Sequence, residues 1–401
     1  MDSFLKRAVV GLFLFLVALG FASKGAAEVG VTANSIVVGC SNSFSGPLAF
    51  TGSEIVKYGI EIYFNQINEQ GGVHGRKLTM KSYDDGYDPT KAVANNKRLV
   101  EQDGVFCILS PQGTSPIAAS LEYLEQQKVP LIFPFQGLPL KGKTIFTTFT
   151  SYPKETEIVL HWLVNKKGFK RIGMIYQDDK YGLSYRDPAM EMLKAMGMDL
   201  VAQESVKRGA IDLSAQMAKL KQANLDVLWV VLVPGPGAMA LKEAKKVGWT
   251  KTKLLAAGPV TDEKFIILSG GEGEGVWGFS VWPDPVHSKK PAVAEYRKTL
   301  EKYAPGHVAN RYSIFGYFYG KLFVEALQRA GKEVTREKLI KTLEGIKNWE
   351  NGIIPPVSFS EENHSAQENG FMVEVKENVF RPSSGWLSME GGKLVERPLG
   401  E

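Results

Sequence analysis

The sequence of 401 residues has little cysteine, with only Cys40 and Cys107. Two thiols at this spacing cannot form a disulfide scaffold or the CxxC knuckle of a structural zinc site. An excess of charge of one sign is also missing, because 48 Lys and Arg residues stand against 43 Asp and Glu residues, a net charge of +5. That excess is small and spread along the chain, so the sequence does not predict a nucleic-acid partner.

Catalytic and metal-binding motifs are missing as well. The five histidines do not occur in HExxH spacing, and the chain has neither a GxSxG nucleophile elbow nor a GxxxxGK[ST] phosphate loop. The paired carboxylates Asp84-Asp85 and Asp178-Asp179 are expected to cap helices or close turns, since neighbouring residues of an extended segment point to opposite sides. We therefore expect a protein that is not an enzyme and has no metal or cofactor.

Two glycine-rich segments resemble dinucleotide-binding loops. Gly273–Gly278 fits the GxGxxG spacing but runs into a predicted strand, whereas the motif must open a helix. Gly235-Pro236-Gly237 does follow a strand and precede a helix, but Pro236 removes a backbone donor from any phosphate cradle. We expect this second segment to be a turn at the carboxyl end of a strand that lines a cleft.

Only one apolar run is long, Ala8–Ala22, and it follows Lys6 and Arg7. A basic start, an apolar run of about 15 residues and small residues before residue 28 are typical of a secretory signal peptide. We expect cleavage after Ala27 and export of the mature chain to the periplasm. An uncleaved membrane anchor is the alternative, although a span normally needs about 20 apolar residues.

The rest of the chain alternates between strand and helix patterns. Examples are the β-branched run Ser35–Cys40 and the helical spacing of Glu54–Glu69, and the same rhythm resumes after Thr150 up to Ala257. Long helices are expected at Ala292–Tyr303, Tyr312–Ala330 and Arg336–Ile346. Two runs of strand–helix units predict an α/β protein with two doubly wound, Rossmann-like lobes.

In this arrangement Cys40 and Cys107 fall on neighbouring strands. Their oxidation after export is an alternative, but parallel strands rarely suit disulfide geometry. We expect two buried thiols.

Ligands of open α/β sheets bind at the carboxyl ends of the strands. In the first half those ends are the loops at Ser45-Gly46-Pro47, 110–115 and 134–137, and in the second half they are the loops at 178–182, 234–235 and 258–261. Ser115 is a predicted N-cap followed by Pro116, so this helix end and the Thr114 hydroxyl are expected to bind a carboxylate.

Several blocks resemble the periplasmic solute-binding proteins of the branched-chain amino-acid (leucine/isoleucine/valine-binding) ABC transporter family. The most specific are the I-N-x-x-G-G-V-x-G block at 67–75 and the Y-D-D-x-x-D-P block at 83–89. The segments 176–182 and Val129-Pro130-Leu131-Ile132 agree with it. The resemblance covers residues 33–390.

The resemblance implies two lobes joined by three crossovers, near Phe146–Tyr152, Gly275–Val281 and Asn351–Ser358. The first lobe would hold residues 33–149 plus 278–354, and the second would hold 150–277 plus 355–390. It further implies a monomer that traps a small-molecule ligand and delivers it to an inner-membrane ABC permease. The rival interpretation is a ligand-sensing module that works with a signalling partner.

Carrying the family's binding residues over succeeds only in part. Thr114 and Tyr181 keep a hydroxyl and an aromatic ring, but Gly137 stands where the family has a Thr, and Val260 replaces the Glu that pairs with the α-ammonium group. The family's small-loop disulfide is absent too, because Tyr87 stands in place of one Cys. The expected ligand-binding residues are Phe50, Gln112, Thr114, Ser115, Phe135, Gln136, Tyr152, Asp179, Tyr181, Pro234 and Val260.

The loss of the Glu bears on the ligand. A buried ammonium group needs a paired carboxylate. We therefore expect a solute without a free α-ammonium, such as an aromatic or short-chain organic acid, with amides and urea derivatives as alternatives. Asp179 would be the charge available to an amine and keeps amino acids open.

Overall fold

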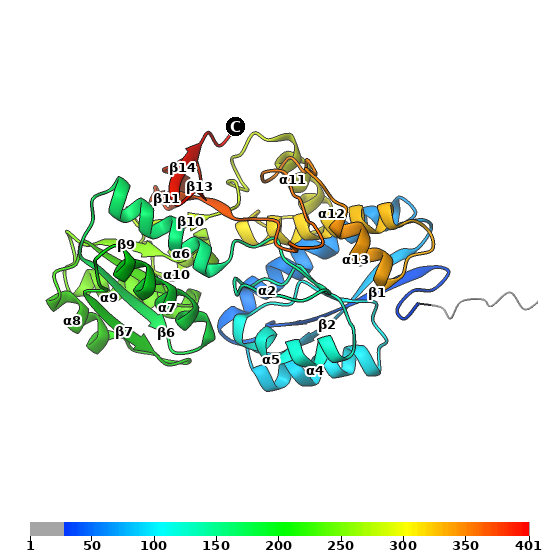
Figure 1. The fold of residues 1–401 in the computed structure, drawn as a ribbon, viewed down its shortest axis with the longest axis horizontal. Helices are drawn as coiled ribbons and strands as arrows, with labels where there is room; N and C mark the ends of the chain where they lie inside the picture. The colour runs from blue at the N-terminus through cyan, green and yellow to red at the C-terminus, as the bar shows by residue number, and fades with distance from the viewer. Residues whose placement is uncertain (1–27, 401) are drawn as a thin grey trace, which may run out of the picture.

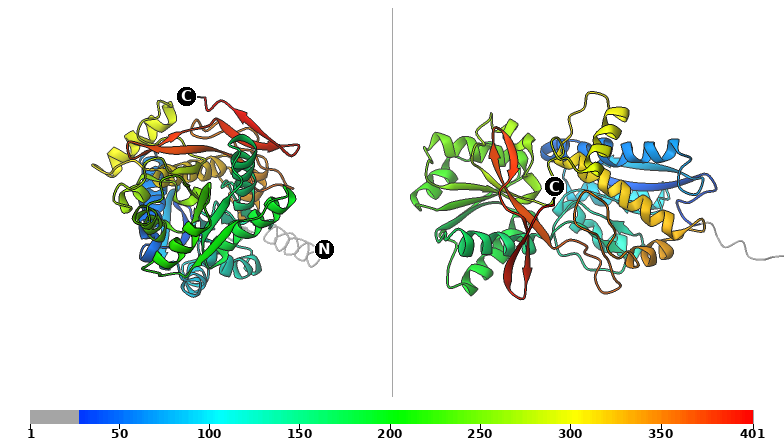
Figure 2. Two further views of the ribbon diagram at one scale, coloured as in Figure 1. Left: turned by 90° about the vertical axis from the view of Figure 1, so that its left-hand side faces the viewer. Right: turned by 90° about the horizontal axis from the view of Figure 1, so that it is seen from above.

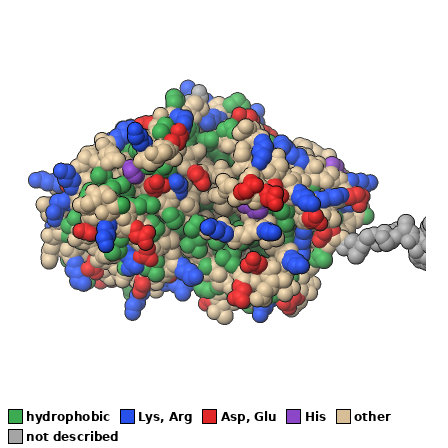
Figure 3. Space-filling view, viewed as in Figure 1, with side chains coloured by type: hydrophobic (Ala, Val, Ile, Leu, Met, Phe, Trp, Pro, Cys, Tyr) green, Lys and Arg blue, Asp and Glu red, His purple; other side chains and the backbone are tan. Residues whose placement is uncertain are grey.

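The computed structural model describes residues 28–400 and shows two α/β lobes side by side (Figure 1). The predicted signal peptide and its cleavage point after Ala27 lie outside the described residues. Within residues 28–400, no helix has the length and apolar character needed to cross a bilayer. On the face seen in Figure 3, acidic and basic side chains are interspersed.

The first lobe is built on a five-stranded parallel sheet in the order β2-β1-β3-β4-β5. Its strands are β1 (Ser35–Asn42), β2 (Lys77–Asp84), β3 (Ile108–Leu109), β4 (Leu131–Ile132) and β5 (Ile145–Phe146). Its helices are α2 (Ala49–Ile55), α3 (Glu61–Glu69), α4 (Pro89–Glu101), α5 (Thr114–Gln126), α11 (Pro291–Tyr303), α12 (Arg311–Ala330) and α13 (Arg336–Glu344).

The predicted helix over Glu54–Glu69 is interrupted by a π-helical turn, η2 (Val56–Ile60), between α2 and α3. Helix α12 packs tightly against this turn. A side chain at Gly316 would place its Cβ 2.0 Å from the Ile55 carbonyl oxygen, and one at Gly59 would meet the Gly316 backbone at 2.6 Å. Glycine at both positions therefore allows the close backbone approach.

The second lobe carries a nine-stranded mixed sheet. Its first half is parallel, like the first lobe: β6 (Ile172–Gln177), β7 (Ala202–Val206), β8 (Val227–Val231), β9 (Lys253–Ala256) and β10 (Trp277–Ser280). Its helices are α6 (Tyr152–His161), α7 (Lys180–Ala195), α8 (Ser214–Gln222), α9 (Pro234–Lys246) and α10 (Glu263–Leu268).

Antiparallel strands, which the sequence analysis did not predict, complete this sheet. They are β11 (Asn369–Lys376), β12 (Val379–Pro382), β13 (Trp386–Glu390) and β14 (Lys393–Arg397). They follow one another in sequence and pair with short connections, as antiparallel strands can. Figure 2 shows this red, C-terminal part against the green lobe.

The chain passes between the lobes three times. The first passage, between β5 and α6, falls within 146–152. The second passage follows β10, which pairs with β9 and β11 of the second sheet. Residues 278–280 therefore lie in the second lobe, whereas the resemblance implied that the first lobe resumes at 278. The third passage lies between Ser365, which still forms a bridge with Thr147 just after β5, and Asn369, where β11 begins. It therefore comes later in the chain than the expected passage at 351–358. A single β-strand or bridge carries too little pattern to mark such a boundary in sequence.

Both lobes are filled with apolar side chains, and the two thiols belong to this interior. Cys40 lies on β1 and Cys107 directly precedes β3; both are fully buried and free, as predicted. Burial raises the pKa of each thiol well above its usual value. The fold is the predicted α/β class with two doubly wound lobes, whose strands end at the space between them.

Candidate functional site

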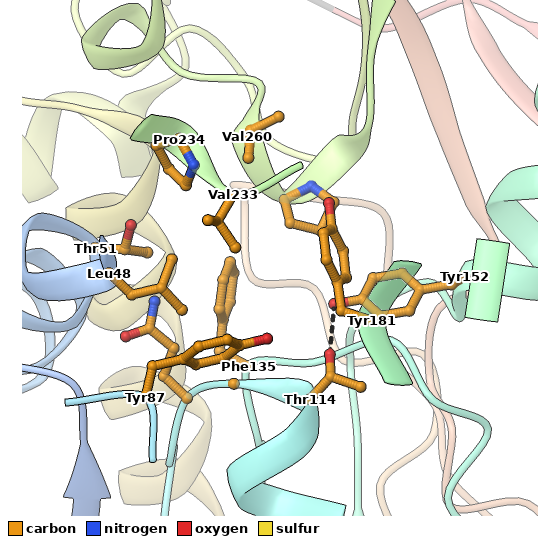
Figure 4. A pocket seen from close by; sticks show the side chains of 13 residues that line it. Leu48, Thr51, Tyr87, Thr114, Phe135, Tyr152, Tyr181, Val233, Pro234 and Val260 are labelled. Carbon is orange, nitrogen blue, oxygen red and sulfur yellow. Dashed lines mark hydrogen bonds between the residues drawn. The ribbon is translucent and has the colours of Figure 1, made fainter. Parts of the chain in front are cut away.

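A cavity lies between the carboxyl ends of the two sheets (Figure 4). The space there that protein atoms do not fill is about 350 Å³, open solvent included. Both lobes contribute to its wall. The lining residues are Leu48, Thr51, Tyr87, Gln112, Gly113, Thr114, Phe135, Tyr152, Tyr181, Val233, Pro234, Pro259 and Val260.

On the first lobe, the loop between β3 and α5 supplies Gln112, Gly113 and Thr114. Gly113 has a φ of 101°, and a Cβ there would lie 2.8 Å from the Tyr87 ring. Glycine is therefore needed for both the backbone angle and the contact. The helix starts at Thr114, and its N-cap is Gly113, two residues before the predicted cap at Ser115.

On the second lobe, three helix starts reach the cavity. Tyr152 opens α6, where Ser151 is the N-cap and accepts a hydrogen bond from the Lys154 amide. Tyr181 lies in the first turn of α7, and Pro234 is the first residue of α9. Pro259 and Val260 come from the 3-10 turn η4 (Gly258–Val260) after β9. Each of these residues lies just after a parallel strand or in the first turn of the helix that follows such a strand. Open α/β sheets place their binding residues at these positions.

Aromatic rings dominate the wall. Tyr152 and Tyr181 meet edge to face, with ring centroids 5.5 Å apart, and Phe135 packs in the same manner on Phe315 at 4.7 Å. The hydroxyl groups of Thr114 and Tyr152 lie 3.4 Å apart across the lobes. Such rings bury large apolar area with defined geometry, so the cavity favours a ligand with a flat or apolar body.

The ring of Tyr152 also explains the missing Thr at Gly137. A Cβ on Gly137 would lie 2.3 Å from that ring, and the Tyr152 amide donates to the Gly137 carbonyl at 2.6 Å. The Tyr152 ring thus occupies the space that a larger side chain at position 137 would need.

Asp179 joins the lobes beside the cavity. Its Oδ2 accepts hydrogen bonds from the Ser115 hydroxyl and the Tyr87 hydroxyl, each at 3.3 Å, and from Gln177 Nε2 at 2.7 Å. Its Oδ1 accepts from the Tyr181 amide at 2.9 Å and caps α7. The carboxylate therefore caps the positive start of α7, lies next to the start of α5, and accepts hydrogen bonds from several groups.

The lining side chains include no charged group. A buried carboxyl group lies further into the second lobe, where Glu155 accepts from the Tyr185 hydroxyl and the Gly258 amide, both at 2.8 Å. Tyr185 in turn packs on Tyr152, with centroids 4.6 Å apart. Burial raises the pKa of Glu155 to about 8, although both hydrogen bonds act in the opposite direction.

Most of the predicted binding residues come together in this wall. Those that line it are Gln112, Thr114, Phe135, Tyr152, Tyr181, Pro234 and Val260. Four do not line it. Phe50 packs edge to face on Tyr312, Ser115 donates to Asp179, and Gln136 donates to the Leu138 carbonyl at 3.2 Å. Asp179 is the fourth.

Six further residues line the cavity without having been predicted from the sequence: Leu48, Thr51, Tyr87, Gly113, Val233 and Pro259. Gly113, Val233 and Pro259 are neighbours of predicted residues, and Tyr87 belongs to the Y-D-D-x-x-D-P block. Leu48 and Thr51 come from η1 (Gly46–Leu48) and α2, and α2 packs against α12.

This site and fold define a two-lobed solute-binding protein. The family model for periplasmic binding proteins matches residues 35–379, so the chain belongs to this family. The Leu/Ile/Val-binding protein of Citrobacter freundii is 26% identical over 248 residues, 61% of this chain and 67% of the relative. Membership of the periplasmic binding proteins, which the resemblance implied, is thereby confirmed.

Solved structures agree on the fold. A possible leucine/isoleucine/valine-binding protein from Rhodopirellula baltica SH 1 superposes with a TM-score of 0.82 at 23% identity, over 89% of this chain and 98% of that one. A fatty acid ABC transporter substrate-binding protein from Thermomonospora curvata gives 0.78 at 22% identity, over 93% and 94%. At such identities the likeness concerns the fold, and the solute must be argued from the cavity.

Proposed function

We propose that the mature chain is the periplasmic receptor of an ABC importer and traps a small, largely apolar organic solute between its lobes. The observation that carries the proposal is the cavity at the carboxyl ends of both sheets, walled by Tyr152 and Tyr181 from one lobe and Phe135 from the other. Closed lobes of this kind would present the solute to an inner-membrane permease. Cleavage after Ala27, export and a monomeric state belong to the same proposal.

The solute lacks a free α-ammonium group. Val260 stands where amino-acid binders of the family have their Glu, its side chain lines the cavity, and no lining side chain offers a carboxylate in exchange. The Asp179 carboxylate accepts hydrogen bonds from five protein groups, so it has little capacity left for an amine. A buried ammonium without a partner would cost several kcal/mol.

Isothermal titration calorimetry of the mature protein tests the proposal. We expect a saturable, one-to-one interaction with at least one member of a panel of short aliphatic and aromatic acids and amides, and weak or absent binding of leucine. The variant Tyr181→Ala removes a ring from the wall and should weaken any such binding. Tight leucine binding would refute the solute class, and a protein that binds no small solute would refute the receptor function.

A further inference from the structure

Two polar side chains in the wall of the cavity have hydrogen-bonding groups without partners. Gln112 is 1% exposed, and neither its Nε2 nor its Oε1 has a hydrogen-bond partner. Tyr181 is 3% exposed, and its hydroxyl is likewise unpartnered. A buried polar group without a partner costs about 1–3 kcal/mol. These groups from opposite lobes are therefore available to a ligand.

The position of Gln112 is confined by the backbone around it. A Cβ at Gly52 would lie 2.9 Å from Gln112 Oε1, so a larger residue in α2 would displace the amide. Gln112 follows β3 and directly precedes Gly113, and it forms a backbone bridge with Phe135 beyond β4. The backbone of Gln112 is therefore held between two neighbouring strand ends, and the glycine in α2 leaves room for the side-chain amide.

No lining side chain carries a charge that could pair with an ionised ligand, and the nearby Arg208 guanidinium bonds to the Tyr87 carbonyl. A carboxylate at the start of α5 would meet Asp179, which already accepts the Ser115 hydroxyl there, and like charges repel. An ammonium group would find no carboxylate among the lining side chains. An uncharged group avoids both costs.

We propose that Gln112 and Tyr181 recognise an uncharged solute that carries a hydrogen-bond donor and an acceptor side by side, such as a carboxamide, lactam or urea, on an apolar body. The Gln112 amide offers one acceptor and two donors, which match such a group reciprocally. The Tyr181 hydroxyl bonds the same group from the second lobe. The rings of Phe135 and Tyr152 contact the apolar body. This inference rests on the proposed receptor function and narrows its solute class.

Matched ligands test it on the mature protein. Benzamide, benzoate and benzylamine share one ring, and 3-methylbutanamide, 3-methylbutanoate and leucine share one branched chain. Calorimetry should show each amide binding about tenfold or more tightly than its charged counterparts. Gln112→Leu and Tyr181→Phe should each reduce that preference. Gln126→Leu, the same change at an exposed position of α5, should leave it unchanged.

The outcomes separate the two proposals. Tighter binding of a carboxylate or of leucine would overturn the inference while leaving a solute receptor. Amide preference that survives in Gln112→Leu would also overturn it. If Gln112→Leu does not fold, the ranking of the six ligands by the unmodified protein decides the matter alone. Failure of all six and of a wider solute panel to bind would overturn both proposals.

Discussion

The Ser115 hydroxyl of the first lobe donates a hydrogen bond of 3.3 Å to the Asp179 carboxylate of the second. This contact joins the start of α5 to the start of α7, next to the cavity but outside its wall. Tyr87 shares the same carboxylate oxygen at 3.3 Å, and its own carbonyl accepts from Arg208 at 3.1 Å. The lobes are thus held together by polar contacts that need no ligand atom.

Replacement of Asp179 should weaken these contacts between the lobes. Asp179→Asn keeps the α7 cap but loses the charge, whereas Asp179→Ala loses both and should cost about 1 kcal/mol more in unfolding free energy. We expect a larger average radius in small-angle scattering and a faster release of ligand. Asp178→Asn, an exposed neighbour, is the matched control. An unchanged radius in Asp179→Ala would contradict this role.

A carboxylate restored at position 260 should change the solute preference. Val260 is 1% exposed and lines the cavity, so Val260→Glu buries a charge and should lower the free energy of unfolding by about 3 kcal/mol. Leucine should offset part of that loss by pairing its ammonium group with the new carboxylate. Thermal denaturation with and without leucine measures both effects. Val260→Gln, similar in size but uncharged, should show no leucine-dependent gain.

Gly137 should tolerate a larger side chain only if Tyr152 is made smaller. Gly137→Thr forces the Tyr152 ring away and should destabilise the protein by about 1–3 kcal/mol. In combination with Tyr152→Ala, the cost of the threonine should nearly vanish. A double-mutant cycle from urea unfolding measures the coupling. Additive effects of the two changes would show that the ring does not occupy the space in question.

Glu155 should make the protein less stable as the pH rises. Burial raises the pKa of its carboxyl group to about 8, above an unfolded value of about 4.5, so the folded state binds one more proton between these values. Stability should fall through this window by up to about 1.4 kcal/mol per pH unit. Burial also raises the pKa of Asp262, which adds a slope in the same direction.

Glu155→Gln isolates this contribution. The variant should lose part of the pH dependence and should be more stable than the unmodified protein at pH 8.5. Urea unfolding at several pH values between 4.5 and 8.5 measures the slopes. Glu157→Gln removes a carboxylate of the same helix that pairs with Lys154 near the surface and should leave the slope unchanged. Equal slopes for Glu155→Gln and the unmodified protein would refute the assignment.

The two thiols should be unreactive in the native protein. Both are buried, and burial raises their pKa values, so little thiolate forms at neutral pH. A thiol reagent should label neither Cys40 nor Cys107 until urea unfolds the chain, after which it should label both. Rapid labelling of either under native conditions would contradict this expectation.

The amino-acid sequence by itself determined the fold class and the half of the site that lies on strand ends. Apolar periodicity marks parallel strands and their helices, and the residues just beyond such strands must meet at one edge of the sheet. Gln112, Phe135 and Pro234 could be predicted in this way. The resemblance added Tyr181 and drew attention to Val260 and Gly137.

The tertiary structure alone decided which polar groups are left for a ligand. Ser115 and Asp179 both lie on predicted binding loops, yet they bond to one another, because two helix starts from different lobes face each other there. Leu48 and Thr51 line the cavity from η1 and α2, and glycines let α12 pack closely against the end of α2 and the turn after it. Contacts between segments so distant in sequence leave no local pattern, and they determine which atoms of Gln112 and Tyr181 remain unpartnered.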